Sequence, residues 1–161
     1  MNKAIFLDRD GVINYEKDDY IYKLQDFKIN KGVIETLKEF QKNDCLLIII
    51  SNQGGIAKGI YKKEDVEKLH QYLINLLKKQ GITLAEIYYC PHHSDIENCI
   101  CRKPDSLLIE KAIARFQINP HISFFIGNSE TDSIAANKVG LNTIKIDSNE
   151  NIMKYCKSIL T

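Results

Sequence analysis

The sequence lacks an excess of charge, a long apolar run and an export signal. Its 22 Lys and Arg residues balance 21 Asp and Glu residues, so the net charge of +1 gives no reason to expect nucleic-acid or anionic-membrane binding through bulk charge. No apolar run approaches the roughly 20 residues that a membrane-spanning helix needs. The N-terminus leads directly into an apolar segment, without a signal peptide. We therefore expect a cytoplasmic protein with no membrane or nucleic-acid partner.

The chain also lacks internal repeats, low-complexity tracts and linkers, so its 161 residues predict one domain, 1–161, and by default a monomer. Short apolar segments that are typical of strands alternate with amphipathic segments that are typical of helices. We expect strands at 4–7, 46–50, 86–89, 123–126 and 143–146. We expect helices at 32–42, 62–80, 104–116, 133–139 and 152–160. This alternation predicts βαβ units, and hence an α/β fold with a Rossmann-like parallel sheet and helices on both faces.

Polar side chains follow four of the predicted strands. They are Asp8 and Asp10 after the first, Ser51, Asn52 and Gln53 after the second, Arg102 and Lys103 after the third, and Asn128, Glu130 and Asp132 after the fourth. Because ligands bind beyond the carboxyl ends of strands in an open parallel sheet, we expect these side chains to meet along one rim.

Two carboxylates two residues apart on an extended segment point the same way, so Asp8 and Asp10 need a compensating cation, proton or lysine. Oxygen ligands of this kind suit Mg²⁺, and Lys103 can hold phosphate oxygens. A carboxylate that faces phosphorus between Mg²⁺ and lysine is an activated nucleophile, and a second acid can move the protons. The pattern therefore indicates phosphoryl transfer to Asp8 and then hydrolysis. The simpler alternative is a strand that ends in a solvated Asp-Gly turn.

Three of the five cysteines lie within a dozen positions, in the pattern C-x-H, six residues, C-x-C. Three thiols and one imidazole form a closed tetrahedral set for structural Zn²⁺, and the predicted ligands are Cys90, His92, Cys99 and Cys101. Free thiols without a metal are the alternative, and a disulfide is less expected in a reducing compartment. Cys45 and Cys156 are predicted to be ordinary buried or half-buried thiols.

The chemistry-bearing segments resemble the four motifs of haloacid dehalogenase superfamily phosphatases, over essentially the whole chain. The matching segments are Asp8-Arg9-Asp10-Gly11-Val12, Ser51-Asn52-Gln53, Lys103 and 127–132. The resemblance implies a fold of this type without an inserted cap domain. Residues 12–30, which we call the flap, and the zinc loop 90–103 would cover the site instead.

By this resemblance Asp8 is the nucleophile and Asp10 the general acid/base. Substrate or phosphate contacts are expected from Arg9, Ser51, Asn52, Gln53, Arg102 and Lys103. Mg²⁺ would be held by Asp8, Asp10 through its backbone carbonyl, and Asn128. The family pattern has Asp where this chain has Asn128, and an amide lacks the negative charge. Metal affinity should therefore fall, with Glu130 as a candidate to compensate.

Residues 5–14, 51–59 and 88–104 resemble two subgroups most closely, the bacterial D-glycero-D-manno-heptose 1,7-bisphosphate 7-phosphatases and the histidinol-phosphatases. Residues 51–59 and the start of the zinc loop favour the heptose enzymes and thus removal of the 7-phosphate in a heptose pathway. The six-residue gap between His92 and Cys99 favours the histidinol-phosphatases. A weakly active or non-catalytic phosphosugar-binding member, because of Asn128, is a further alternative. A zinc-loop nucleic-acid module is disfavoured by the charge balance.

Overall fold

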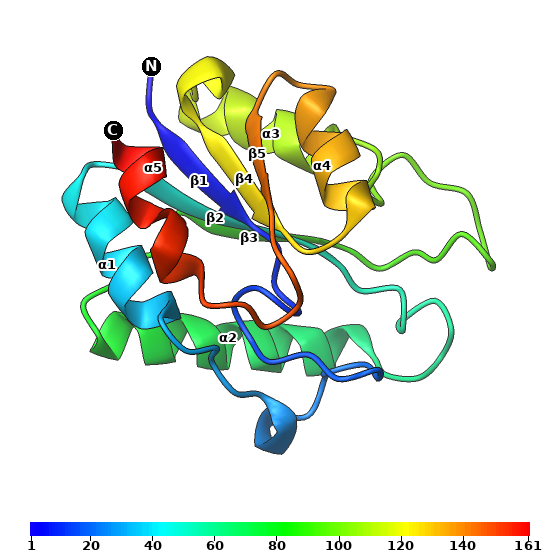
Figure 1. Ribbon diagram of the computed structural model, residues 1–161. Coiled ribbons are helices and arrows are strands. Elements are labelled where there is room, and N and C mark those ends of the chain that lie inside the picture. The colour runs from blue at the N-terminus through cyan, green and yellow to red at the C-terminus, as the bar shows by residue number, and fades with distance from the viewer.

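The computed structural model describes all residues, 1–161, and its centre is a five-stranded parallel sheet (Figure 1). The strands are β1 (Ala4–Leu7), β2 (Leu46–Asn52), β3 (Glu86–Cys90), β4 (Phe124–Gly127) and β5 (Asn142–Lys145). Their order in the sheet is β3-β2-β1-β4-β5, so the chain starts in the middle and adds strands first on one side and then on the other. The predicted Rossmann-like parallel sheet is confirmed.

Helices cover both faces of this sheet, as expected. In Figure 1, α1 (Val33–Lys42), α2 (Lys63–Lys79) and α5 (Cys156–Leu160) lie on one face, and α3 (Leu107–Phe116) and α4 (Glu130–Asn137) on the other. Three short 3-10 helices, η1 (Leu24–Asp26), η2 (Pro120–Ile122) and η3 (Ile152–Tyr155), complete the set.

The central strands are buried on both sides because their side chains alternate between two apolar layers. Ile5 and Leu7 of β1 pack in the layer under α1 and α2, whereas Ala4 and Phe6 pack in the layer under α3 and α4. Burying one such side chain contributes about 1.5–3 kcal/mol. The unbroken apolar runs of β1 and β2 thus place these strands at the centre, and their carboxyl ends come to lie side by side.

The three largest differences from the expected elements concern helices. The helix predicted at 133–139 begins at Glu130, because Ser129 and Asp132 form a capping box in which each side chain accepts from the other's backbone N–H. The segment 152–160 is η3 followed by α5 rather than one helix. The helix expected from Pro104 begins at Leu107.

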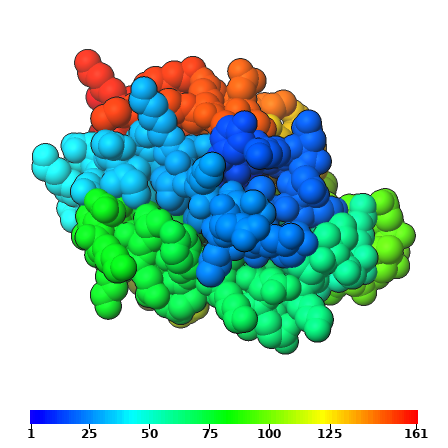
Figure 2. Space-filling view, turned by 90° about the horizontal axis from the view of Figure 1, so that it is seen from below, coloured from blue at the N-terminus to red at the C-terminus, as the bar shows by residue number.

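The flap is an irregular segment, with η1 as its only helix and no strand. Figure 2 shows it at the centre of the face seen from below, with α2 beside it. Within the molecule, no helix combines the length and the apolar character that crossing a membrane requires.

Candidate active site

A buried lysine joins the ends of three elements at the carboxyl edge of the sheet. Asp8 follows β1 directly and donates its backbone N–H to the Ile126 carbonyl of β4 at 3.0 Å. The Nζ atom of Lys103 lies 2.9 Å from Asp8 Oδ1 and 2.5 Å from Asp132 Oδ1. It also donates to the Ile50 carbonyl of β2 at 2.9 Å. Residues from β1, β2, the loop after β3 and α4 therefore meet at the expected rim.

The charges in this cluster are not balanced. Burial raises the pKa of Asp8 to about 7, and the Asp132 carboxylate adds to the rise while Lys103 opposes it. Burial would lower the pKa of Lys103, but the carboxylates of Asp8 and Asp132 outweigh it, so that pKa is raised. Two buried carboxylates share one lysine, and a bound cation would relieve the remaining negative charge.

Three side chains hold the carboxylate of Asp10. Arg9 Nη2 donates to both Asp10 oxygens, at 2.9 and 3.0 Å. Gln53 Nε2 donates to Asp10 Oδ2 at 3.0 Å, and Asn14 Nδ2 donates to Asp10 Oδ1 at 3.0 Å. The orientation of Asp10 therefore depends on residues of β1's own loop and of the loop after β2.

Arg9 was expected to contact substrate, but the structure buries it completely, at 0% exposed. Its guanidinium packs behind Asp10, where Nη2 also donates to the Ile21 carbonyl at 2.7 Å and Nη1 lies 3.2 Å from His70 Nε2. Arg9 therefore positions Asp10 and does not face the cavity. The physical reason is that its bidentate pair with the adjacent carboxylate compensates a charge that would otherwise be buried alone.

His70 on α2 supports this arrangement from beneath. Because an arginine can only donate, His70 Nε2 must accept, which assigns the neutral tautomer with the proton on Nδ1. Burial, followed by the charge of Arg9, lowers the pKa of His70 to about 3. No local sequence pattern links α2 to the β1 loop, so this contact of His70 could not be predicted from the sequence.

Gln53 and Ser51 are buried as well, so they do not line the cavity as expected. Gln53 Nε2 donates to Ser51 Oγ at 2.8 Å, and its Oε1 accepts from the Tyr61 hydroxyl at 2.7 Å. The Ser51 hydroxyl thus keeps its proton for another acceptor. Gln53 therefore helps to orient Asp10. Tyr61, which the sequence did not single out, orients Gln53 in turn.

A cavity of about 280 Å³ opens above this cluster. Five carboxylates and two cations are among its 13 lining residues, which are Asp8, Asp10, Glu16, Asp19, Tyr20, Ile21, Asn52, Arg102, Lys103, Asn128, Ser129, Thr131 and Asp132. An oxygen-rich donor set with excess negative charge fits a hard divalent cation such as Mg²⁺. The predicted ligands Asp8, Asp10 and Asn128 all belong to this lining.

Asn52 and Arg102 connect the cavity with the loop after β3. Asn52 Nδ2 donates to the Lys103 carbonyl at 3.1 Å and Asn52 Oδ1 accepts from the Lys103 backbone N–H at 3.0 Å. Both ends of the amide are therefore used to hold Lys103 in place. Arg102 Nη1 donates to the His92 carbonyl at 3.1 Å, and this side chain is half-buried beside the cavity.

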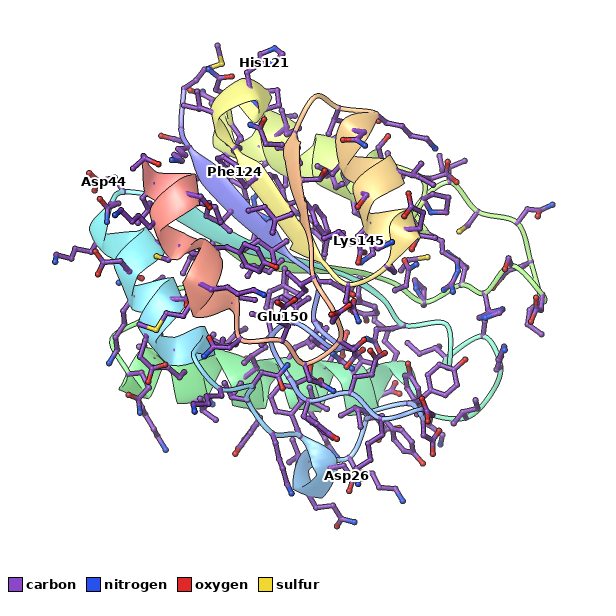
Figure 3. The ribbon with its side chains drawn as sticks, in the orientation of Figure 1. Asp26, Asp44, His121, Phe124, Lys145 and Glu150 are labelled. Atoms are coloured by element: carbon purple, nitrogen blue, oxygen red, sulfur yellow. The ribbon has the colours of Figure 1, made fainter.

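Asn128 lines the cavity together with Glu16, an acid that lies outside the sequence motifs. Its Nδ2 donates to Glu16 Oε2 of the flap at 3.0 Å and to Ser148 Oγ at 2.7 Å. Glu130, the expected compensating acid, is 69% exposed and accepts from Lys145 Nζ at 2.8 Å instead. Figure 3 shows Lys145 on β5. Glu130 therefore does not compensate for Asn128.

The four cysteine and histidine side chains expected to hold zinc come together in the loop 90–103. The ligand atoms of Cys90, His92, Cys99 and Cys101 all lie within 4.8 Å of one another. Cys101 Sγ lies 3.0 Å from Cys90 Sγ and 3.2 Å from His92 Nδ1, and no disulfide is present. A compact set of three thiols and one imidazole could hold a tetrahedrally coordinated metal.

Comparison with known proteins agrees with these features. The family model described as polynucleotide kinase 3 phosphatase matches residues 3–159. The D-glycero-alpha-D-manno-heptose-1,7-bisphosphate 7-phosphatase of Campylobacter jejuni is 42% identical, over 88% of this chain and 80% of the relative. The beta-anomer enzyme of Helicobacter pylori is 45% identical, over 83% and 77%. The histidine biosynthesis bifunctional protein HisB of Legionella pneumophila is 36% identical, over 91% and 42%.

Solved structures with a similar fold include a heptose 1,7-bisphosphate phosphatase and another hydrolase. A crystal structure of D,D-heptose 1,7-bisphosphate phosphatase from B. bronchiseptica, complexed with magnesium and phosphate, matches with a TM-score of 0.85 and 24% identity, over 97% of this chain and 86% of that one. A Had-superfamily hydrolase from Ehrlichia chaffeensis matches with a TM-score of 0.66 and 17% identity, over the whole of both chains. The chain therefore belongs to the haloacid dehalogenase superfamily of phosphatases, in the family of the heptose 1,7-bisphosphate 7-phosphatases.

Proposed function

We propose that this chain is a Mg²⁺-dependent phosphomonoester hydrolase that works through an aspartyl-phosphate on Asp8. The observation that carries the proposal is the position of Lys103 Nζ, which contacts both Asp8 and Asp132 at the base of a cavity that Asp10 also lines. Lysine beside a carboxylate nucleophile can bind the oxygens of the incoming phosphate.

Asp8 Oδ2, the oxygen that does not contact Lys103, attacks phosphorus while the bond from phosphorus to the ester oxygen breaks. Asp10, which must carry a proton when the substrate is bound, gives this proton to the leaving alcohol and then removes a proton from water. That water attacks the same phosphorus, and breaking of the bond between Asp8 and phosphorus releases inorganic phosphate. The Arg102 guanidinium, which lines the cavity, would contact phosphate oxygens. Bound Mg²⁺, held by Asp8, the Asp10 carbonyl and Asn128, would offset the negative charge at phosphorus.

The proposed substrate is D-glycero-D-manno-heptose 1,7-bisphosphate, with removal of the 7-phosphate. The relatives named for this reaction support it, with identities of 42% and 45% over most of the chain. Their names differ in the anomer, so both anomers are candidates. Histidinol phosphate is the second candidate, favoured by the HisB relative and by the short gap between His92 and Cys99.

A phosphate-release screen distinguishes these substrates. Both anomers of the heptose bisphosphate and histidinol phosphate are compared with and without Mg²⁺, and with EDTA as the metal-free control. We expect Mg²⁺-dependent release of one phosphate from the heptose bisphosphate. Release from histidinol phosphate alone would assign the other substrate. Binding of the sugar phosphate without release at any Mg²⁺ concentration would point to the weakly active or non-catalytic alternative.

We further propose that the Cys/His loop holds one structural Zn²⁺ and so fixes Arg102 and Lys103, which follow its last ligand. Free thiols as metal ligands agree with a reducing compartment such as the cytoplasm. A single catalytic domain acting as a monomer is the arrangement we propose. The cavity volume of about 280 Å³ supports a small phosphorylated substrate.

A further inference from the structure

We propose that Glu16 of the flap compensates for Asn128, where the superfamily pattern has an acid. Glu16 restores the missing negative charge at the metal edge and turns the Asn128 amide so that its oxygen is free to bind the cation. The inference rests on the proposed Mg²⁺ site and assigns it a residue outside the four motifs.

The position of Glu16 is fixed by the segment that follows β5. Asn149 Oδ1 accepts from the Glu16 backbone N–H at 2.7 Å, and Asn149 Nδ2 donates to the Glu16 carbonyl at 2.8 Å. The Asn149 backbone N–H donates to the Gly11 carbonyl at 2.7 Å, which joins the segment to the β1 loop as well. Glu150, labelled in Figure 3, marks this segment. These hydrogen bonds therefore hold Glu16 in a fixed position in the cavity wall.

The close approach of Glu16 and Asn128 depends on the glycine beneath them. Gly11 has φ +82°, and a Cβ atom at this position would come within 2.7 Å of Glu16 Oε2 and would also collide with the Asn128 amide. A residue with a side chain would be strained there by its backbone as well. The glycine of the first motif thus leaves the space in which the acid and the amide meet.

The hydrogen bonds define which end of the Asn128 amide is free. An ionised carboxylate only accepts, so the atom that faces Glu16 Oε2 must be Nδ2. The second N–H of the same group donates to Ser148 Oγ. Asn128 Oδ1 and Glu16 Oε1 carry no hydrogen bond, and both residues line the cavity. Two oxygens of suitable kind are thus left for a hard cation.

The other acids near Asn128 are already engaged. Asp132 pairs with Lys103 and accepts from the Ser129 backbone N–H, which is needed for the start of α4. Glu130 points to solvent and pairs with Lys145. Glu16 is the acid in direct contact with Asn128. Its negative charge is therefore the one that replaces the charge missing at position 128.

The test measures Mg²⁺ binding by isothermal titration calorimetry on the full chain without substrate. Glu16→Gln keeps an acceptor for Asn128 but removes the charge, and we expect it to weaken Mg²⁺ binding by about tenfold. Glu16→Gln combined with Asn128→Asp moves the charge to position 128, and we expect it to restore binding to within about threefold of the wild-type affinity. Glu130→Gln makes the same change in net charge two residues from Asn128 and should bind Mg²⁺ like the wild type.

Circular dichroism of each variant checks that the fold is retained. Equal Mg²⁺ affinity in Glu16→Gln and the wild type overturns the role of Glu16 and leaves the proposed phosphatase function standing. A weakened Glu16→Gln that the second substitution does not restore overturns charge compensation. Absence of Mg²⁺ binding in the wild type itself contradicts the proposed function and, with it, this inference.

Discussion

The cavity after β1 and the Cys/His loop after β3 lie next to each other but are held together differently. Around Asp8 and Asp10, hydrogen bonds and ion pairs arrive from several elements of a packed α/β core. The loop 90–103 contains no helix or strand beyond its first residue, and its ligand atoms gather at one point. Many separate contacts thus hold the side chains of the cavity in position. The conformation of the loop, in contrast, depends on four side chains and the ion that they would share.

The largest effect is expected from a substitution that removes the nucleophile of the cavity and leaves the fold intact. Asp8→Asn should lower phosphate release by at least about 1,000-fold, because an amide cannot form the aspartyl-phosphate. The circular dichroism spectrum and the zinc content should stay those of the wild type. Asp26→Asn, an exposed change on η1, is the matched control and should keep full activity. Substantial turnover by Asp8→Asn would contradict the role of Asp8 as nucleophile.

The second largest effect is expected from the removal of one proposed zinc ligand from the loop. Cys99→Ser should lose the bound zinc, become sensitive to trypsin between residues 90 and 103, and lose activity by about 10- to 100-fold because Arg102 and Lys103 are no longer held. Metal analysis of the purified protein measures the zinc, with about one per chain expected in the wild type. Cys156→Ser, at a half-buried thiol on α5, should change none of these. A zinc-free wild type with full activity would exclude a structural zinc.

A third experiment uses pH to test the role of His70, which contacts Arg9 behind Asp10. The pKa of His70 is lowered to about 3, so between that value and its usual 6.5 the unfolded chain binds a proton that the folded chain does not. The stability that neutral His70 contributes is therefore present above pH 6.5 and is lost as the pH falls, by up to about 1.4 kcal/mol per pH unit. His70→Gln, which can still accept from Arg9, should show a shallower loss in urea unfolding between pH 6.5 and 4.5.

His121→Gln on the exposed η2 is the control for this titration, since His121 has the same side chain without the burial. The charged and titratable groups that act on His70 are Arg9, Asp10 behind it and, through its ring, Tyr89. Identical slopes for the wild type and His70→Gln would show that His70 is not the acid-sensitive group.

The smallest expected effect removes one contact from the distributed network. Tyr61→Phe deletes the hydroxyl that donates to Gln53 Oε1, at a cost of about 1 kcal/mol in the free energy of unfolding. Activity should fall by less than tenfold, because Arg9 and Asn14 still hold Asp10. Tyr72→Phe, at an exposed position of α2, is the control. A loss as large as that of Cys99→Ser would contradict the view that the cavity is held by many contacts.

Local signals in the sequence were sufficient for the architecture. The apolar run of β1, followed directly by Asp8 and Asp10, and the β-branched run of β2 predicted the central strands, since burial on both faces leaves no polar alternation. The start of α4 was predicted too late, because its apolar residues come after the Ser129 capping box. The four side chains that we propose as zinc ligands stood out as a set because their spacing is short and three of them are cysteines.

Roles within the rim could not be predicted in the same way. Arg9, Ser51 and Gln53 stand in motif positions beside Lys103, yet they are buried beneath the cavity and hold one another or Asp10. Neither the direction of a side chain after a strand end nor its burial follows from residue type and spacing.

The amino-acid order alone indicates a parallel α/β sheet, an acid pair after its first strand and a compact Cys/His set that could hold a metal, because each of these depends on neighbours within a few residues. Only the folded chain brings Glu16 to Asn128, 112 residues away, and His70 to Arg9. Such contacts depend on how loops and helices pack across the edge of the sheet. The contact between Glu16 and Asn128, on which our proposal of a complete metal site depends, is therefore visible only in the tertiary structure.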